Sequence, residues 1–362
     1  MAKYEKVDVS VPGDPGPVYI PGKRIQAKDL RGVRDESLVD AVPLDTPWTM
    51  FIEPTNACNF RCVFCPTGHP KLIKQAGRKN TLMEFELFKK VIDDLRVFPR
   101  PLKMLNLYKD GESLLHPDFP GLVRYAKGAG VSEQIWVKTN GSHLNPKLNK
   151  QLVTCGLDML GISAFTEKGF KEIAGVGTDY QEYRANVLDL YQKSLTIKQC
   201  APDYTVAPRT QISVKIADTN LTNEEKQTFM DDFSDRCDYI AIEGLHGWSA
   251  SAEYDWKMGT NQSFDGTPRT EKIACPLVMY MLTVNSNGSV SICNDDWMQA
   301  HNIGDANTES IKDIWNGNKL RHFRMMHLKG LRGWNAACNG CDYMQVLPDN
   351  IDEHLDEMKG RL

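Results

Sequence analysis

The chain has 362 residues, of which 41% are hydrophobic and 25% are charged, and its formal net charge is −4. This length predicts about two domains, or one α/β barrel with an appendage, and the small acidic excess disfavours nucleic acid as a partner. The longest apolar run, 277–284, is too short to span a membrane, and no apolar segment follows Met1 as in a signal peptide. We therefore expect a cytoplasmic protein with no membrane partner.

The first 46 residues are rich in proline, glycine and charge, and they predict an N-terminal arm over 1–46. From 47 to 244, short apolar runs alternate with segments of helical period, which indicates a parallel sheet of βαβ units. Six such units predict an α/β fold, a partial (β/α)6 barrel whose chemistry lies at the carboxyl ends of the strands. The expected strands are 49–53, 103–107, 134–138, 159–162, 211–216 and 239–242, and the expected helices are 83–97, 121–129, 146–154, 180–195 and 223–233.

A polar linker is expected over 245–274, and the sequence pattern changes again from Cys275. The region 275–362 predicts a small α+β domain that begins with a β-hairpin. Its expected elements are the hairpin strands 279–284 and 289–293 and one helix over 310–326.

Seven of the ten cysteines fall into two groups, and in a reducing compartment such groups bind metals more often than they form disulfides. The first group is Cys58, Cys62 and Cys65, with CxxxCxxC spacing directly after the first strand. Three thiolates on one short loop can hold one face of an Fe4S4 cube and leave the fourth iron without a protein ligand. The alternative is a zinc site, for which His69 is the only nearby fourth ligand.

The segment 53–66, with Phe64 before the last cysteine, resembles the signature of the radical S-adenosyl-L-methionine (SAM) superfamily. The strand and helix pattern over 48–244 is similar to the barrel of that family. The resemblance implies a [4Fe–4S] cluster on the three cysteines and SAM on the open iron, where SAM is cleaved to a 5′-deoxyadenosyl radical that abstracts hydrogen. It also implies flavodoxin or ferredoxin as the reductant.

The resemblance implies SAM contacts at the ends of the barrel strands. The segment 109–113 lies where the family has a GGE-like motif, with Asp110 in place of one glycine, and 139–141 is similar to its T-N-G turn. The arginine that pairs with the SAM carboxylate in many relatives is missing, and Lys138 or Lys215 would replace it. A plain strand-ending turn and an ordinary serine are the alternatives. The predicted cofactor-binding residues are Phe64, Asp110, Gly111, Glu112, Ser113, Lys138, Asn140 and Ser163.

The second group is Cys275 and Cys293, at the two ends of the hairpin, with Cys338 and Cys341 in a distant CxxC. Four thiolates from separated segments can enclose one metal centre and leave no open position; structural zinc is the alternative. The region 275–345 resembles the SPASM and Twitch extensions of radical SAM enzymes. Because no cysteine follows Cys341, the resemblance implies the shorter Twitch form with a second [4Fe–4S] cluster, as in 2-deoxy-scyllo-inosamine dehydrogenase-like enzymes.

A fully ligated second cluster suggests electron acceptance. A substrate radical beside a hydroxyl is a strong acid and a strong reductant, so loss of a proton to a base and of an electron to the cluster converts a secondary alcohol to a ketone. The first hypothesis is therefore a radical SAM oxidoreductase acting on a sugar, cyclitol or aminoglycoside in natural product biosynthesis.

Three alternatives stay open. One is a ribosomal-peptide maturase that crosslinks or epimerises its substrate. Another is a redox-neutral epimerase or dehydratase acting on a glycan or aminoglycoside, for which Cys155, Cys200 or Cys237 would donate hydrogen. The third is a non-enzymatic electron carrier, which the open iron of the first site argues against.

Polar side chains at the strand ends and the domain junction are the candidates for substrate binding and for the catalytic base. Each is also explained as an ordinary hydrogen-bonded core or surface group. The predicted catalytic residues are Tyr108, Lys215, Glu243, His246 and Asp295, and Glu53 and Asn294 are further candidates.

Overall fold

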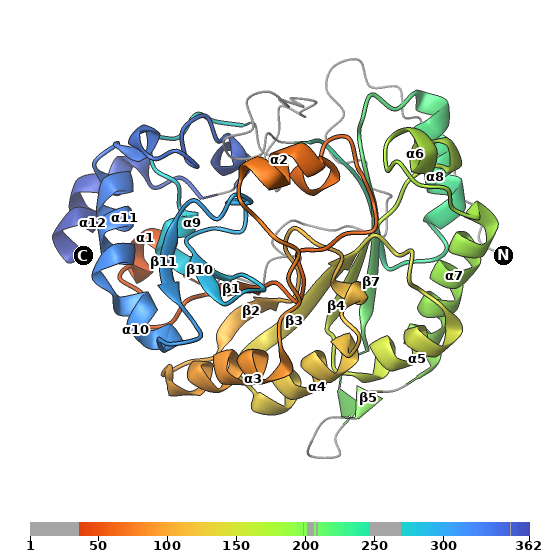
Figure 1. Cartoon of the computed structure of the whole chain (residues 1–362), viewed down its shortest axis with the longest axis horizontal. Helices are drawn as coiled ribbons and strands as arrows, with labels where there is room; N and C mark the ends of the chain where they lie inside the picture. Colours follow the sequence, from red (N-terminus) through yellow and green to blue (C-terminus); the bar gives the residue numbers. More distant parts are fainter. Residues whose placement is uncertain (1–35, 198, 201–205, 208, 246–268, 348) are drawn as a thin grey trace.

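The computed structural model describes residues 36–197, 199–200, 206–207, 209–245, 269–347 and 349–362. Its centre is one sheet of nine strands in the order β11-β10-β9-β1-β2-β3-β4-β7-β8. Seven of these strands run parallel, and the six that come before residue 244 form the curved wall in Figure 1, which confirms the predicted partial barrel. They are β1 (Thr49–Ile52), β2 (Leu102–Asn106), β3 (Ser132–Thr139), β4 (Met159–Ser163), β7 (Gln211–Ala217) and β8 (Tyr239–Glu243).

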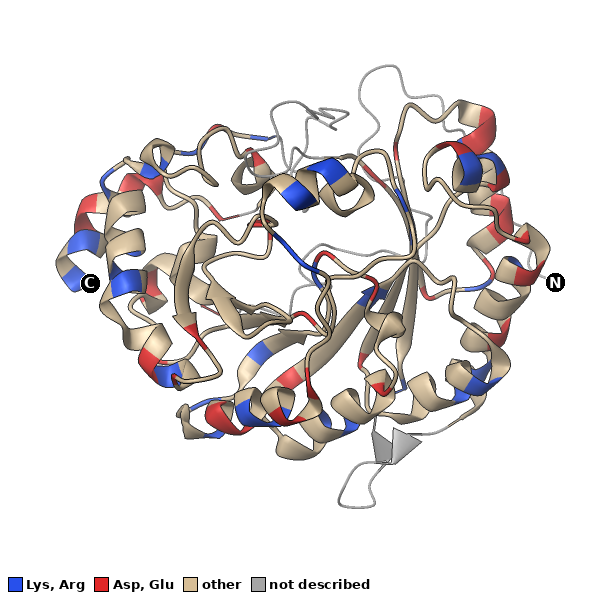
Figure 2. Cartoon of the chain, in the orientation of Figure 1, with Lys and Arg blue, Asp and Glu red and all other residues tan. Residues whose placement is uncertain are grey.

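Five helices lie outside the parallel strands, as the helical periods predicted (Figure 1). They are α3 (Phe85–Asp94), α4 (Phe119–Ala129), α5 (Pro146–Thr154), α7 (Tyr180–Thr196) and α8 (Asn223–Phe233). Side chains cap the first turns of four of them: Asp118, Asn145, Asp179 and Thr222 accept hydrogen bonds from amides two or three residues later. Figure 2 shows both signs of charge on α3, α7 and α8, as expected for helices with one solvated face.

Shorter elements complete the barrel, and the sequence pattern did not indicate most of them. The expected helix 83–97 is α3 followed by a 3₁₀ turn, η2. The short elements are α1 (Leu38–Ala41), η1 (Pro66–Gly68), α2 (Pro70–Gln75), η2 (Leu95–Val97), η3 (Ser113–Leu115), α6 (Glu167–Glu172), β5 (Gln199–Cys200) and β6 (Val206–Ala207). Within the described ranges, no helix combines the length and the apolar character needed to cross a bilayer.

The predicted C-terminal hairpin continues the barrel sheet. Strand β9 (Met281–Val284) pairs parallel with β1, and β10 (Ser289–Ser291) pairs antiparallel with β9. Strand β11 (Asn302–Asp305), which was not expected, pairs with β10. The start of the expected strand 279–284 is wrong, because its first two residues belong to a helical turn, α9 (Leu277–Tyr280). Strand β9 of the hairpin therefore forms hydrogen bonds with β10 on one side and with the barrel strand β1 on the other.

The single helix expected over 310–326 is also wrong. The structure has two helices, α10 (Ile311–Asn316) and α11 (Asn318–Leu328), because Gly317 is extended with φ −71° and ψ 153°. A Cβ on Gly317 would lie 3.0 Å from the Asp313 carbonyl oxygen, so the missing side chain lets the chain turn closely past α10. The remaining elements are η5 (Arg332–Trp334), η6 (Tyr343–Val346), η7 (Asp352–His354) and α12 (Leu355–Arg361).

One continuous core joins the barrel and the C-terminal region. Trp315 is fully buried, and its indole Nε1 donates to the Leu44 carbonyl oxygen at 3.0 Å. The Arg324 guanidinium lies over the Trp315 ring, 4.1 Å from the centroid. The expected division into a barrel over 47–244, a linker over 245–274 and a domain over 275–362 stays a prediction, as does the arm over 1–46, most of which lies outside the described residues.

Candidate functional site

The first cysteine group lies on a loop that directly follows β1, and all three side chains are half-buried. Two backbone bonds clamp this loop to the segment after α6: the Arg61 amide donates to the Ala174 carbonyl and the Val63 amide to the Ile173 carbonyl, both at 2.9 Å. The loop then folds back on itself, because a Cβ on Gly68 would lie 2.3 Å from the Cys62 carbonyl oxygen. Backbone bonds therefore fix the path on which Cys58, Cys62 and Cys65 are carried.

The segment after β2 lies against this loop. The Glu112 amide donates to the Ala57 carbonyl at 2.8 Å, and the Thr67 hydroxyl donates to the Asp110 carbonyl at 3.1 Å. A Cβ on Gly111 would lie 2.2 Å from the Thr55 carbonyl oxygen, so only glycine permits this approach.

The carboxylate of Glu112 braces the ends of β2 and β3. It accepts from the Asn140 amide at 2.6 Å, the Thr139 hydroxyl at 2.7 Å and the Leu114 amide at 3.0 Å. Burial raises the pKa of Glu112, and the three donors act against that shift. Ser113 is also internally bonded, since its hydroxyl donates to the Leu107 carbonyl at 2.9 Å. The side-chain oxygens of Glu112 and Ser113 are therefore engaged within the protein, and the predicted contacts with SAM stay a prediction for their backbone atoms.

Asn140 and Phe64, also predicted to bind the cofactor, border the cysteine loop. The Asn140 side-chain amide donates to Asn59 Oδ1 at 2.9 Å, which ties the β3 turn to the loop. The Phe64 ring stacks on Phe165, with centroids 6.5 Å apart. His69, the alternative fourth ligand of a zinc site, has its Nε2 atom 2.7 Å from the Val63 carbonyl oxygen. That nitrogen is therefore engaged with the backbone.

A buried charge network, which the sequence did not reveal, begins at Asp110. Asp110 Oδ2 lies 3.0 Å from Arg78 Nη1 and 3.2 Å from Lys109 Nζ, and all three side chains are 1–4% exposed. Glu53 extends the network, with its Oε1 atom 3.8 Å from Arg78 and 3.3 Å from the Asp110 amide nitrogen. The Asp110 and Glu53 carboxylates are thus engaged within the protein.

The same network reaches the C-terminal hairpin. Lys109 Nζ donates to Asn285 Oδ1 at 2.9 Å and to the Asp296 carbonyl at 3.0 Å. Glu53 Oε2 accepts from the Ser286 amide at 3.1 Å and from its hydroxyl at 2.9 Å. Lys109 and Glu53 therefore connect the barrel strand ends to the loops that border the second cysteine group.

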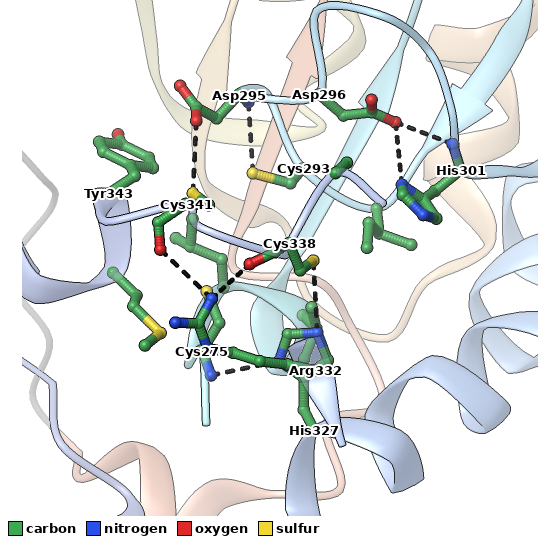
Figure 3. A pocket seen from close by; sticks show the side chains of 15 residues that line it. Cys275, Cys293, Asp295, Asp296, His301, His327, Arg332, Cys338, Cys341 and Tyr343 are labelled. Carbon is green, nitrogen blue, oxygen red and sulfur yellow. Dashed lines mark hydrogen bonds and ion pairs between the residues drawn. The ribbon is translucent and has the colours of Figure 1, made fainter. Parts of the chain in front are cut away.

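The second cysteine group lines one pocket, although its members come from three separate segments (Figure 3). Cys275 lies just before α9, Cys293 just after β10, and Cys338 and Cys341 in the loop after η5. Asp295, His301, His327 and Arg332 line the same pocket. The structure thus brings together four thiols predicted from sequence and adds two imidazole rings and a guanidinium that no motif marked.

Three of the four sulfurs in this pocket have a defined polar neighbour. The Asp295 amide donates to Cys293 Sγ at 3.2 Å, and the Cys341 thiol donates to Asp295 Oδ2 at 3.6 Å. His327 Nε2 lies 3.7 Å from Cys338 Sγ. Asp295, predicted as a catalytic residue, is therefore buried beside the second cysteine group.

Arg332 and His327 also hold the backbone of the second group. The Arg332 guanidinium donates to the Cys338 and Cys341 carbonyls, the latter at 3.2 Å, so it braces the CxxC turn. The Cys275 amide donates to His327 Nδ1 at 3.2 Å. Burial lowers the pKa of His327 to about 4, and the charge of Arg332 acts in the same direction.

Burial is the main influence on the pKa of the thiols in both cysteine groups. It raises the pKa of Cys65 and Cys275 to about 11 and that of Cys338 to about 12, and it raises the pKa of Cys58, Cys62, Cys293 and Cys341 as well. Metal binding must therefore release protons from these thiols. Soft thiolates suit iron–sulfur clusters. Among the described residues, no three Cys, His, Asp or Glu side chains are placed to hold a single metal ion.

Four predicted residues gather at the carboxyl ends of the barrel strands. Lys215, on β7, forms an ion pair with Glu243 at the end of β8. Lys138 Nζ lies 5.4 Å from the centre of the Tyr108 ring. Both residues lie close enough to Lys215 to change its pKa electrostatically. Burial lowers the pKa of Lys215, whose side chain is 27% exposed.

Ser163 ends β4 beside these residues, paired in register with Lys215. His246 lies outside the described residues. Two of the scattered cysteines are bonded to their own helical turns: the Cys155 thiol donates to the Leu152 carbonyl at 3.1 Å and the Cys237 thiol to the Phe233 carbonyl at 3.2 Å. The side chain of Cys200 is likewise not among those described.

Two family models match the chain. Residues 52–199 match the radical SAM superfamily, and residues 275–342 match SPASM, an iron–sulfur cluster-binding domain. The first range contains the loop after β1, and the second contains all four cysteines of the pocket in Figure 3.

Two curated relatives are similar over part of their length. A GTP 3′,8-cyclase of Chlorobaculum tepidum is 32% identical over 150 residues, which are 41% of this chain and 42% of the relative. An S-adenosyl-L-methionine-dependent 2-deoxy-scyllo-inosamine dehydrogenase of Niallia circulans is 30% identical over 84 residues, 23% of this chain and 34% of the relative. The matched segments span less than half of either relative.

Two solved structures share the fold. BtrN in complex with AdoMet and 2-DOIA has a TM-score of 0.51 and 16% identity, over 82% of this chain and 92% of that one. SuiB of Streptococcus suis bound to the precursor peptide SuiA has a TM-score of 0.59 and 13% identity, over 89% and 75%. The two domain matches show that the chain belongs to the radical SAM superfamily and carries a SPASM domain at its C-terminal end, and the two solved structures share its fold.

Proposed function

We propose that this chain oxidises a secondary alcohol of a sugar, cyclitol or aminoglycoside, with one [4Fe–4S] cluster for SAM cleavage and a second as the electron acceptor. The observation that carries the proposal is the pocket of the second group, where four thiols, from Cys275, Cys293, Cys338 and Cys341, meet. Four protein ligands leave a [4Fe–4S] cluster no open position for substrate, so electron acceptance is the role that such a site supports.

In this proposal Cys58, Cys62 and Cys65 hold the first cluster. The backbone around Gly111 contributes to the SAM site, and Lys138 is the partner of the SAM carboxylate because it lies at the end of β3 beside Tyr108. When bound, the first cluster with SAM supplies the hydrogen-abstracting chemistry, and the second cluster accepts an electron.

Lys215 is the proposed base. Oxidation of a carbinol to a ketone removes a hydrogen atom from carbon, a proton from the hydroxyl and one electron, and the proton needs an acceptor on the protein. Burial lowers the pKa of Lys215, which makes the neutral amine more accessible, and Glu243 stabilises the ammonium formed when the amine takes the proton. Ketone formation should therefore increase as pH rises through the lowered pKa of Lys215.

The 2-deoxy-scyllo-inosamine dehydrogenase that matches 84 residues supports the substrate class, because that enzyme is named for dehydrogenation of an aminocyclitol. SuiB, whose structure was solved with a precursor peptide, shares the fold. The test must therefore distinguish a peptide substrate from a cyclitol or aminosugar.

The test is an anaerobic assay on reconstituted protein with SAM, dithionite and a panel of cyclitols, aminosugars and short peptides. The expected result is one 5′-deoxyadenosine for each ketone formed, from a cyclitol or aminosugar only. Turnover of peptides alone, or product that keeps the oxidation state of the substrate, overturns the proposal.

Lys215→Met tests the base, with Lys193→Met as the matched control, because Lys193 also pairs with a carboxylate, Asp189, but on the outer helix α7. We expect Lys215→Met to slow ketone formation by roughly 10²–10⁴-fold while SAM still binds, and Lys193→Met to leave the rate unchanged. Loss of SAM binding in Lys215→Met would assign that lysine to the SAM carboxylate instead.

A further inference from the structure

We infer that His327 is a positioning residue for the second cluster: its Nε2–H group donates a hydrogen bond to the sulfur of Cys338 and thereby raises the reduction potential of the cluster. The inference rests on the proposed function in one respect, which is that the four cysteines of the second group hold a cluster. It identifies the group that would make this cluster a better electron acceptor.

The backbone fixes the tautomer of His327. The Cys275 amide can only donate, and it lies 3.2 Å from His327 Nδ1, so Nδ1 is the accepting nitrogen. In a neutral imidazole the other nitrogen, Nε2, then carries the hydrogen. That nitrogen lies 3.7 Å from Cys338 Sγ, so the N–H donor faces a sulfur (Figure 3).

The ring is held in this orientation by its surroundings. His327 is fully buried in the last turn of α11, and it joins the backbone of one ligand in the pocket, Cys275, to the side chain of another, Cys338. The two partners lie at different nitrogens, and rotating the ring by half a turn would place the Cδ2 carbon against the Cys275 amide and the Cε1 carbon against Cys338. Both contacts would then be lost.

Two other side chains place oxygen atoms near these sulfurs, and the Arg332 guanidinium, which lines the same pocket, donates to backbone carbonyls. Asp295 Oδ2 lies 3.6 Å from Cys341 Sγ, and Asn294 Oδ1 lies 4.0 Å from Cys293 Sγ. A carboxylate near a thiolate disfavours the more negative, reduced form of a cluster. An N–H donor to sulfur favours the reduced form, because sulfur carries more charge after reduction. His327 thus opposes the effect of Asp295.

The first experiment measures the reduction potential of the second cluster. We would use the full chain with the first cluster removed (Cys58, Cys62 and Cys65 to Ala) and compare His327→Phe with His327→Gln by EPR-monitored titration. We expect His327→Phe to weaken one-electron uptake roughly tenfold, which corresponds to about 59 mV toward lower potential. His327→Gln, which keeps an N–H donor, should recover most of this shift.

His301→Phe is the matched control. His301 lines the same pocket, but its Nδ1 atom lies 3.5 Å from Asp296 Oδ2. Its replacement should leave the potential unchanged. An equal shift in His301→Phe and His327→Phe would mean that loss of any buried ring changes the potential, and it would overturn the inference.

A second measurement is spectroscopic. In wild-type protein with ¹⁵N-labelled histidine, electron–nuclear double resonance on the reduced second cluster should detect one coupled ¹⁵N nucleus, which is absent in His327→Phe. Absence of that coupling in wild type overturns the inference. Iron and sulfide analysis distinguishes failure of the proposed function from failure of this inference. A wild-type chain with no second cluster overturns both. A loaded cluster whose potential is unchanged in His327→Phe overturns the role of His327 alone.

Discussion

The two cysteine groups are held in place by different means. The first occupies one loop, 58–65, whose path is fixed by backbone hydrogen bonds to the segment after α6 and by glycines that allow close approach. The second collects three segments, and side chains, those of His327 and Arg332, connect their ligands. A site of the first kind tolerates changes to surrounding side chains, whereas a site of the second kind depends on them.

The largest difference is expected when ligands are removed. In the proposed assignment, Cys62→Ala should abolish formation of 5′-deoxyadenosine, a loss beyond the roughly 100-fold that removal of an outer-shell partner costs. Cys338→Ala should leave SAM cleavage measurable and stop ketone formation. Product analysis by mass spectrometry checks both results. Cys155→Ala is the control, because that thiol is bonded to its own helical turn.

The next largest effect is expected at Lys109, which connects the barrel to the C-terminal region. Lys109→Met removes a side chain that is 1% exposed and joins Asp110 to Asn285 and the Asp296 carbonyl. Breaking a buried ion pair costs about 3–5 kcal/mol, because one charge stays buried with fewer partners. We expect that loss in the free energy of unfolding measured with urea.

Lys89→Met is the control for this prediction. Lys89 pairs with Glu86 on the surface, where the two side chains are 34% and 81% exposed. Such an exposed pair contributes little to stability, because solvent screens the attraction. Equal losses in the two variants would show that the buried network does not stabilise the junction.

Gly111→Ala tests the close approach at the first site. The added Cβ would lie 2.2 Å from the Thr55 carbonyl oxygen, so backbone must move at a cost of about 1–3 kcal/mol. Gly128→Ala, in α4 with nothing within 4 Å, should instead stabilise the chain by about 0.4–1 kcal/mol. Thermal unfolding of the two variants beside wild type gives the sign of each change, and a stabilising Gly111→Ala would contradict the packing described.

The smallest effect is a pH slope at Glu112. Burial raises its pKa, so the folded state keeps a proton that the unfolded state has lost, and the free energy of unfolding falls as pH rises from the ordinary carboxyl value of 4.5 to the raised one. One proton accounts for at most about 1.4 kcal/mol per pH unit. Glu112→Gln should remove this contribution in urea titrations at several pH values.

Glu225 supplies a control of opposite sign. The Thr222 amide lowers the pKa of this carboxyl in the capping box of α8, so its contribution is present above the ordinary carboxyl pKa and is lost as pH falls. Glu225→Gln and Glu112→Gln should therefore change the pH dependence in opposite directions. Changes of the same sign would contradict the environment described for one of them.

The barrel strands and both cysteine groups could be predicted from the sequence, because both signals are local. Strand β4 and helix α5 follow from apolar runs and from the capping residue Asn145, which act over a few residues. The spacing from Cys58 to Cys65 is equally local. For the second group, the cysteine pattern predicted one metal centre but left zinc open, and resemblance to a family was needed to favour a cluster, because its cysteines lie in distant segments.

The rest depends on contacts that no periodic pattern records. Arg78 and Lys109 are charged residues in polar stretches, and the position of Asp110 decides their burial. His327 is one histidine in a helix, and its role follows from the placement of Cys275 and Cys338. The roles of these residues can be inferred only from the contacts that they make in the folded structure.

The pairing of β9 with β1 has a consequence for synthesis of the protein. Thr49 is opposite Met281, so the edge of β1 stays open until more than 200 further residues have left the ribosome. An unpaired strand edge is a template for association with other chains. Nascent chains that stop short of Met281 should therefore aggregate or engage chaperones, whereas release of β9 closes the edge and ends that exposure.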